Sequence, residues 1–143
     1  MSRALGIDLG TKRIGVAVSS GTLATPYEVV VRSGDRSRDH ARIAELAVET
    51  GAEVVVVGMP LSLDGTMGPA ARAAEAEITE LADTLEVPVA AYDERLTTVT
   101  ADRQLMGQNL GAGARRQVVD KVAASVMLQA WLDAGSPSEG FRP

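Results

Sequence analysis

Apolar residues alternate with polar or very small ones over the start of the chain, a pattern typical of β-strands. The alternation runs through residues 5–10 and again through 14–19. The short connection at residues 11–13 predicts that these two strands form an antiparallel hairpin. A third strand is expected around residues 27–32.

The rest of the chain alternates between helical and strand patterns. Gly51 is expected to end one helix and Pro69 to occupy the first turn of the next. Helices are predicted over residues 36–50, 69 to about 85 and 114–134, and a short helix is predicted after Thr98, its N-cap. Strands are predicted at residues 54–57 and 87–92. This order predicts an α/β fold with a mixed five-stranded sheet and helices on both faces. In such sheets, ligands usually bind at the carboxyl ends of the strands.

Length and composition indicate one domain without membrane spans. The chain has 143 residues, of which 45% are hydrophobic and 3% aromatic, so the core must be aliphatic. Residues 1–134 are assigned to the domain and 135–143 to a flexible tail. No apolar stretch is long enough to span a membrane, and the start of the chain does not resemble a signal peptide, so a cytoplasmic location is expected.

Several kinds of chemistry are excluded by what the sequence lacks. There is no cysteine, which excludes disulfides, thiolate zinc sites and cysteine nucleophiles. There is a single histidine, His40, which argues against HExxH metalloproteases and Ser-His-Asp triads. His40 itself is expected to be exposed and inert. A net charge of −5 argues against binding of nucleic acid through overall positive charge.

Carboxylates occur at two unusual places near predicted strands. Asp8 interrupts an apolar strand, and we expect Gly6 and Gly10 to leave open space around it. Asp93 and Glu94 follow a later strand, and spacing does not choose between them. The ordinary interpretations are a turn hydrogen bond for Asp8 and a solvated turn for the pair.

A third carboxylate, Asp120, lies on the last predicted helix but off its polar stripe. An ion pair with Arg116, four residues earlier, is the ordinary interpretation. Three carboxylates on separate elements could converge around a cation, and Mg²⁺ prefers oxygen ligands. Two such ions could promote hydrolysis of a phosphodiester without any His or Cys ligand.

Phosphate contacts are expected near these acids. Lys12, Arg13 and Arg95 lie close to them in sequence, and arginine is a good phosphate partner. The loop at residues 57–66 allows close approach of backbone N–H groups to a phosphate. The candidate loop residues are Gly58, Asp64 and Gly65. A second basic group flanks the first helix and is expected to be solvated: Arg32, Arg36, Arg38 and Arg42.

Four blocks of sequence carry a family resemblance. They are GIDLGTKRIGVAVS from Gly6, VVVGMPLSLDGTMGP from Val55, YDERLTTVTA from Tyr92 and VDKVAASVMLQAWL from Val119. In this order they resemble the YqgF-type family of bacterial nucleases, which is related to Holliday junction resolvases. The resemblance implies an RNase H-like fold whose first three strands are antiparallel.

The resemblance also implies a function and a site. It implies a cytoplasmic nuclease that trims the 5′ end of precursor 16S rRNA, with Mg²⁺ or Mn²⁺, two ions being expected. The acidic triad falls on Asp8, Glu94 and Asp120, as catalytic residues and metal ligands. One position departs from the family, because Ser20 stands where an Asp is frequent. The expected partners are structured RNA, branched DNA and ribosome-precursor proteins, and the chain is expected to be a monomer or homodimer.

Three other functions are open to this sequence. The first is resolution of four-way DNA junctions within the same fold. The second is ATP binding, because GIDLGT also resembles the phosphate loop of the sugar-kinase, actin and Hsp70 superfamily, although that superfamily uses two such domains. The third is a non-catalytic module that docks on a ribosome precursor, which would have no need of three carboxylates facing its own ligand.

Overall fold

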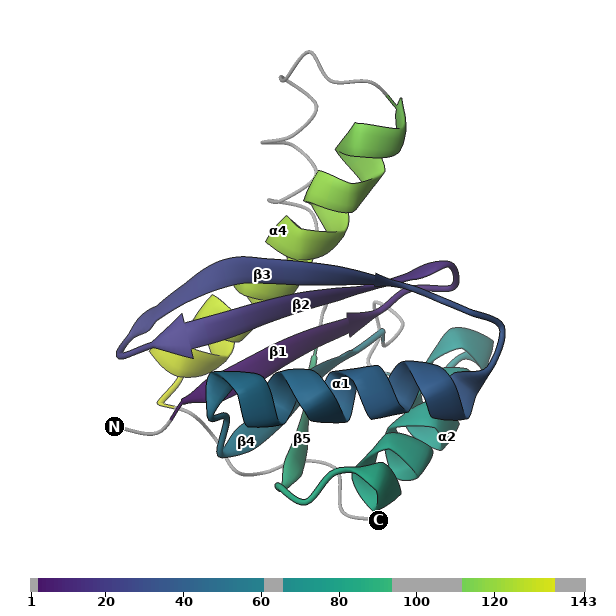
Figure 1. The fold of residues 1–143 in the computed structure, drawn as a ribbon, viewed down its shortest axis with the longest axis horizontal. Helices are drawn as coiled ribbons and strands as arrows, with labels where there is room; N and C mark the ends of the chain where they lie inside the picture. Colours follow the sequence, from purple (N-terminus) through teal and green to yellow (C-terminus); the bar gives the residue numbers. More distant parts are fainter. Residues whose placement is uncertain (1–2, 61–65, 94–111, 136–143) are drawn as a thin grey trace.

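The fold is built on a mixed five-stranded sheet in the order β3-β2-β1-β4-β5 (Figure 1). The computed structural model describes residues 3–60, 66–93 and 112–135, with side chains of the last helix from residue 122 onward. The strands are β1 (Ala4–Leu9), β2 (Arg13–Ser20), β3 (Leu23–Val31), β4 (Val54–Met59) and β5 (Val89–Asp93). The helices are α1 (Arg36–Thr50), α2 (Pro69–Thr84) and α4 (Ala112–Asp133).

Strand directions confirm the predicted mixed sheet. β1, β2 and β3 pair antiparallel, whereas β1, β4 and β5 pair parallel. The β1–β2 hairpin predicted from the short connection is present. The short helix that we expected near Thr98 lies outside the described residues.

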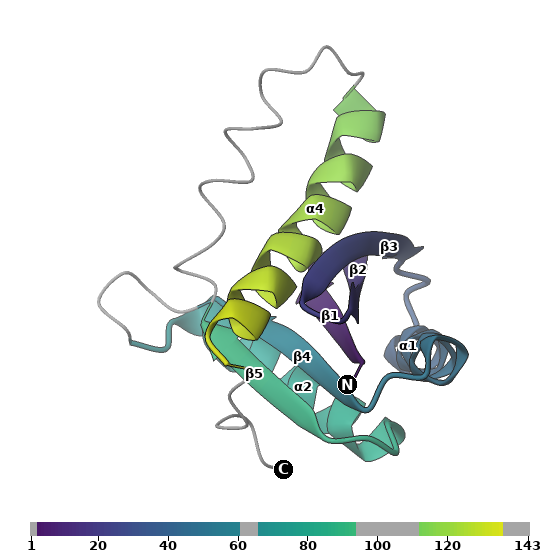
Figure 2. The ribbon, with the colours of Figure 1, turned by 90° about the vertical axis from the view of Figure 1, so that its left-hand side faces the viewer.

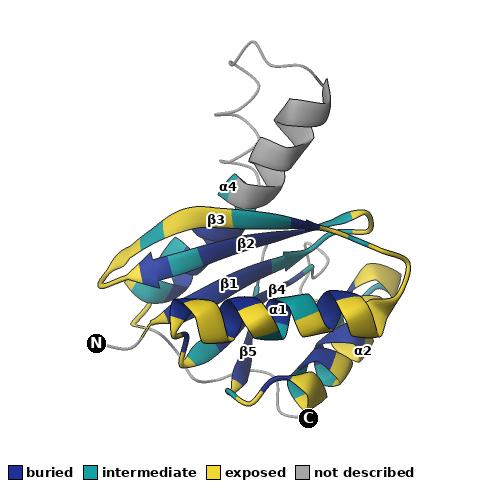
Figure 3. Cartoon of the chain, in the orientation of Figure 1, coloured by how far each residue is buried: buried dark blue, intermediate teal, exposed yellow. Residues whose placement is uncertain are grey.

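Helices cover both faces of the sheet, as predicted. Figure 2 shows α1 and α2 on one side and α4 on the other, and Figure 3 shows the buried residues on the surfaces that face each other. The larger aliphatic cluster packs α1 and α2 against the sheet and includes Leu5, Ile7, Ile43, Leu46, Val55, Val57, Ile78 and Leu81. A thinner cluster packs α4 on the opposite face and includes Ala4, Ala17, Val56, Ala124, Met127, Leu128 and Trp131. The core is therefore aliphatic, with Trp131 as its one buried aromatic among the described residues. No helix in the described ranges is long and apolar enough to cross a membrane.

Local sequence features set the helix ends where they were predicted. The side chain of Asp35 accepts a hydrogen bond from the Arg38 backbone N–H and caps α1. Gly51 ends α1 in the left-handed region, with φ of 70°. Pro69 occupies the first turn of α2, where its missing N–H costs no helical hydrogen bond.

Strand β3 begins earlier than the predicted residue 27. Its first half is mostly exposed and includes Pro26, so it lacks the apolar alternation that marks a half-buried strand. The register with β2 shifts at this point, since Glu28 pairs with Val16 and Pro26 pairs with Ala17. Tyr27 is therefore an extra residue without a partner in the β2–β3 ladder, as in a β-bulge. Strand β5 differs less, beginning two residues after the predicted position.

Two glycines are needed for close approach, and the open space predicted beside Asp8 is occupied. A Cβ at Gly6 would lie 2.9 Å from the Leu128 Cβ of α4, and a Cβ at Gly10 would lie 2.4 Å from the Arg13 carbonyl oxygen. The prediction was wrong because the space that a glycine leaves is filled here by another helix and by the hairpin turn.

The prediction of an exposed His40 is also wrong. His40 is 2% exposed, and its Nε2 lies 2.8 Å from Oε2 of Glu77, a residue of α2 that is itself buried. Arg32 was expected to be solvated, but it pairs with the same carboxylate through two hydrogen bonds. Helical periodicity predicts which apolar residues are buried. It contains no information about buried polar side chains that form hydrogen bonds with side chains of other helices or strands. The prediction holds better for Arg36 and Arg38, which are exposed.

Candidate active site

Asp8 lies near the carboxyl end of β1, half-buried, on the sheet face that α4 covers. Strand alternation places it on the same face as Gly6, against which α4 packs. Its partner on β2 is Gly15. On the other side, Ile7 pairs with Val57 of β4, so Gly58 is the next position along, level with Asp8. Neither position that flanks Asp8 on the neighbouring strands carries a side chain.

The carboxyl ends of β1, β4 and β5 lie at one edge of the sheet, since these three strands are parallel. Asp93 ends β5 and pairs with Met59, which belongs to the cluster under α1 and α2. Tyr92 instead packs against the α4 cluster. Strand alternation therefore places Asp93 and Asp8 on opposite faces of the sheet, which removes Asp93 as a candidate partner of Asp8.

The other two predicted acids are only partly within the description. Glu94 follows directly after the described end of β5, and Asp120 belongs to α4, one turn before Ala124, with its side chain outside the described part. The predicted substrate residues Asp64, Gly65 and Arg95 also lie outside the described residues. Within residues 3–60, 66–93 and 122–135, no group of three or more His, Cys, Asp or Glu side chains could hold a metal ion. Convergence of the three acids therefore stays a prediction.

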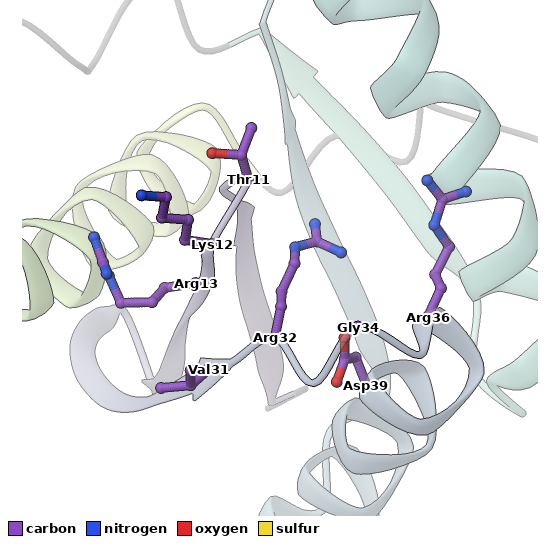
Figure 4. A pocket seen from close by; sticks show the side chains of 8 residues that line it. All are labelled: Thr11, Lys12, Arg13, Val31, Arg32, Gly34, Arg36 and Asp39. Carbon is purple, nitrogen blue, oxygen red and sulfur yellow. The ribbon is translucent and has the colours of Figure 1, made fainter.

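Lys12 and Arg13 line a cleft of about 540 Å³ beside the β1–β2 turn. Its cationic side chains come from three places: the turn, the end of β3 and the start of α1 (Figure 4). Arg32 and Arg36 are the two that sequence reasoning did not assign to the site. Their spacing suggested only a solvated helix flank, and nothing in it shows that the end of β3 lies beside the hairpin turn. The lining residues are Thr11, Lys12, Arg13, Val31, Arg32, Gly34, Arg36 and Asp39.

Ser20, the departure from the family pattern, lies at the far end of β2. It pairs with Leu23, five residues along the strand from Gly15, the partner of Asp8. At the usual rise of a strand, this separates Ser20 from the Asp8 level by about 17 Å. A side chain at position 20 therefore takes no part in the Asp8 site.

The family model described as "RuvX: Holliday junction resolvase" matches residues 2–134. A "Putative pre-16S rRNA nuclease" from Myxococcus xanthus is 44% identical over 138 residues, covering 96% of this chain and 91% of that protein. A protein of the same name from Leifsonia xyli is 46% identical over 132 residues, covering 91% and 84%.

A solved structure, "T. thermophilus RuvC in complex with Holliday junction substrate", has a similar fold. It aligns with a TM-score of 0.58 over 95% of this chain and 98% of that chain, at 19% identity. T. thermophilus RuvC is also similar in a second structure, with a TM-score of 0.52. At this level of identity the likeness concerns the fold, and it confirms the RNase H-like architecture expected from the sequence blocks.

Proposed function

Because this chain belongs to the RuvX family, we propose that it is a nuclease that hydrolyses phosphodiester bonds at the 5′ end of precursor 16S rRNA. Its curated relatives of 44% and 46% identity carry the name of that activity. The single observation that carries the proposal is the position of Asp8, a half-buried carboxylate at the strand-end edge between Gly15 and the level of Gly58.

Asp8, Glu94 and Asp120 are proposed to hold divalent cations, Mg²⁺ or Mn²⁺. The donor set fits such ions, because carboxylate oxygens are the ligands that hard cations prefer, and the strand position paired with Asp8 is a glycine. A pair of these ions would activate water and stabilise the leaving oxygen. Their positive charge also explains how a chain with a net charge of −5 can bind nucleic acid.

The remaining residues of the proposed site bind and orient the substrate. Lys12 and Arg13, from the β1–β2 turn, and Arg95, which follows Glu94, would bind backbone phosphates. Gly58, near the end of β4, and Asp64 and Gly65, which follow that strand in sequence, would offer backbone N–H groups to the same strand of RNA. The substrate and its ribosome-precursor proteins are cytoplasmic, so we propose that location for this chain.

Substitution of Asp8 by Asn tests the proposal. The variant keeps the size of the side chain but loses the charge, and we expect cleavage of precursor 16S rRNA in Mg²⁺ to fall by about a hundredfold or more. Asp93→Asn is the matched control, because Asp93 ends a strand on the opposite face of the sheet, and it should keep its activity. Addition of EDTA should abolish cleavage by the wild type. Full activity of Asp8→Asn, or of the wild type in EDTA, would refute the proposal.

A four-way DNA junction is the second candidate substrate. It is favoured by the description of the family model and by the fold of the junction-bound RuvC. We rank it second because the two relatives named above carry the name of an rRNA nuclease. Assay of the same samples on both substrates distinguishes the two. Paired symmetric nicks in the junction, without cleavage of the RNA, would reverse the ranking.

A further inference from the structure

Four hydrogen bonds hold the β1–β2 turn, and two of them come from Arg32. The backbone N–H of Arg32 donates to the Lys12 carbonyl oxygen at 3.0 Å, and its Nε donates to the Gly10 carbonyl oxygen at 2.7 Å. The other two are within the turn, where the Gly10 N–H donates to the carbonyl oxygens of Asp8 at 3.1 Å and Arg13 at 3.0 Å. The ladder between β1 and β2 ends at the pair Leu9–Ile14, so beyond that pair these four bonds set the conformation of the turn, and among them only those of Arg32 come from outside it.

Arg32 is in turn fixed by a buried carboxylate. Its Nη1 and Nη2 donate to the two oxygens of Glu77 at 2.8 and 2.9 Å. His40 Nε2 lies 2.8 Å from one of the same oxygens. The side chain of Glu77 is 7% exposed and that of Arg32 17%. Glu77 belongs to α2 and His40 to α1, so this cluster ties the turn to both helices of that layer.

The guanidinium of Arg32 is held by these contacts. Each of its three nitrogens donates one hydrogen bond to Gly10 or Glu77, which uses three of its five N–H groups, and the side chain is mostly buried. The Glu77 carboxylate already neutralises its charge, and separating this buried pair to reach a substrate phosphate would be costly. Arg32 therefore acts on the substrate through the turn.

We propose that Arg32 is a positioning residue, which fixes the β1–β2 turn so that Lys12 and Arg13 face the phosphates of the substrate. Strand alternation places Arg13 on the same sheet face as Gly15, the partner of Asp8. A turn held in this conformation presents its cations at the end of the sheet where Asp8 lies. The inference rests on the proposed nuclease function, and it adds the residue that orders the phosphate-binding turn.

The test is Arg32→Lys in the full chain. Lysine keeps the positive charge beside Glu77, but one ammonium cannot replace both the paired hydrogen bonds to that carboxylate and the separate bond to Gly10. We expect KM for precursor 16S rRNA to rise about tenfold, which corresponds to the loss of one charge-assisted hydrogen bond. The value of kcat should stay within about twofold, because Asp8 is held by the ladder. Amide hydrogen exchange should become faster at Gly10 and stay unchanged within β1.

The matched control is Arg42→Lys. Arg42 lies outside the cleft, and it forms ion pairs with Glu28 and Glu45. Its KM and the exchange rate at Gly10 should stay at the wild-type values. If Arg32→Lys fails to fold, the double variant Arg32→Met with Glu77→Met removes both charges together and should show the same rise in KM.

A wild-type KM in Arg32→Lys would overturn the inference, and so would a loss of thermal stability with no change in KM or in exchange at Gly10. Asp8→Asn is measured alongside to separate the two proposals. If Asp8→Asn is inactive while Arg32→Lys resembles the wild type, only the role of Arg32 fails. If Asp8→Asn cleaves normally, the proposed nuclease site itself fails.

Discussion

Replacement of Glu77 by Gln measures how much the buried charge cluster stabilises the packing of α1 and α2. Burial raises the pKa of Glu77, but hydrogen bonds from His40 and Arg32 outweigh this and lower it from 4.5 to about 2. A depression of that size corresponds to about 3 kcal/mol in favour of the folded state at neutral pH. Loss of one partner of a buried ion pair costs about 3–5 kcal/mol, which agrees with that value. We therefore expect Glu77→Gln to lower the free energy of unfolding by about 3 kcal/mol at pH 7.

Urea denaturation followed by circular dichroism gives this free energy, and its pH dependence tests the cause. Because the pKa is lower in the folded state, the stabilisation is complete above 4.5 and is lost as the pH falls toward 2. The difference between wild type and variant should therefore shrink over that range. Glu80→Gln is the control, since Glu80 pairs with Arg36 while its side chain is 55% exposed, and it should cost less than about 1 kcal/mol. A loss below about 1 kcal/mol for Glu77→Gln, or a difference that is constant from pH 7 to pH 2, would refute the reasoning.

Two further substitutions test the packing of the sheet. Gly6→Ala places a Cβ 2.9 Å from the Leu128 Cβ, so α4 must shift and the free energy of unfolding should fall by about 1–3 kcal/mol; an unchanged urea midpoint would contradict the close approach. Ser19→Ala removes the buried hydroxyl that accepts a hydrogen bond from the Ala4 N–H at 2.8 Å, which should cost about 1–3 kcal/mol, and a thermal melt equal to that of the wild type would contradict this role.

Much of the fold could be predicted from the sequence, because its determinants are local. The hairpin follows from two alternating runs and a short connection. The ends of α1 and α2 follow from Gly51 and Pro69, each of which acts through its own backbone geometry. Strand β3 was predicted less well, since the exposed half that contains Pro26 pairs with β2 without an apolar pattern of its own.

The contacts of polar residues could not be predicted in the same way. Glu77 is next to the buried Ile78 on α2, and a helical wheel gives no reason to bury a glutamate. Its burial is explained only by His40 of α1 and Arg32 at the end of β3, which are 37 and 45 residues away in sequence. Such a cluster depends on how three elements meet, and this is information that no single periodicity contains.

In the candidate site, some features could be predicted from the sequence and others could not. Asp8 could be chosen because a carboxylate inside an apolar strand is unusual, and that choice needed no knowledge of the fold. Spacing did not choose between Asp93 and Glu94, whereas the family resemblance implied Glu94; the register of β5 adds that Asp93 lies on the face opposite Asp8. The open space predicted at Gly6 and Gly10 is absent, because these glycines are packed against α4 and the turn; the glycines that flank Asp8 from the neighbouring strands are Gly15 and Gly58.

The irregularity in β3 has a consequence for how this protein behaves at high concentration. β3 is an outer strand of the described sheet, and it exposes the apolar side chains of Leu23 and Val31. A regular strand of this kind would be a template for pairing with a second chain. Pro26 cannot donate a hydrogen bond, and the extra residue Tyr27 twists the strand at the same point. Together they interrupt the row of N–H and C=O groups that an incoming strand would need, and so protect the outer edge of the sheet against aggregation.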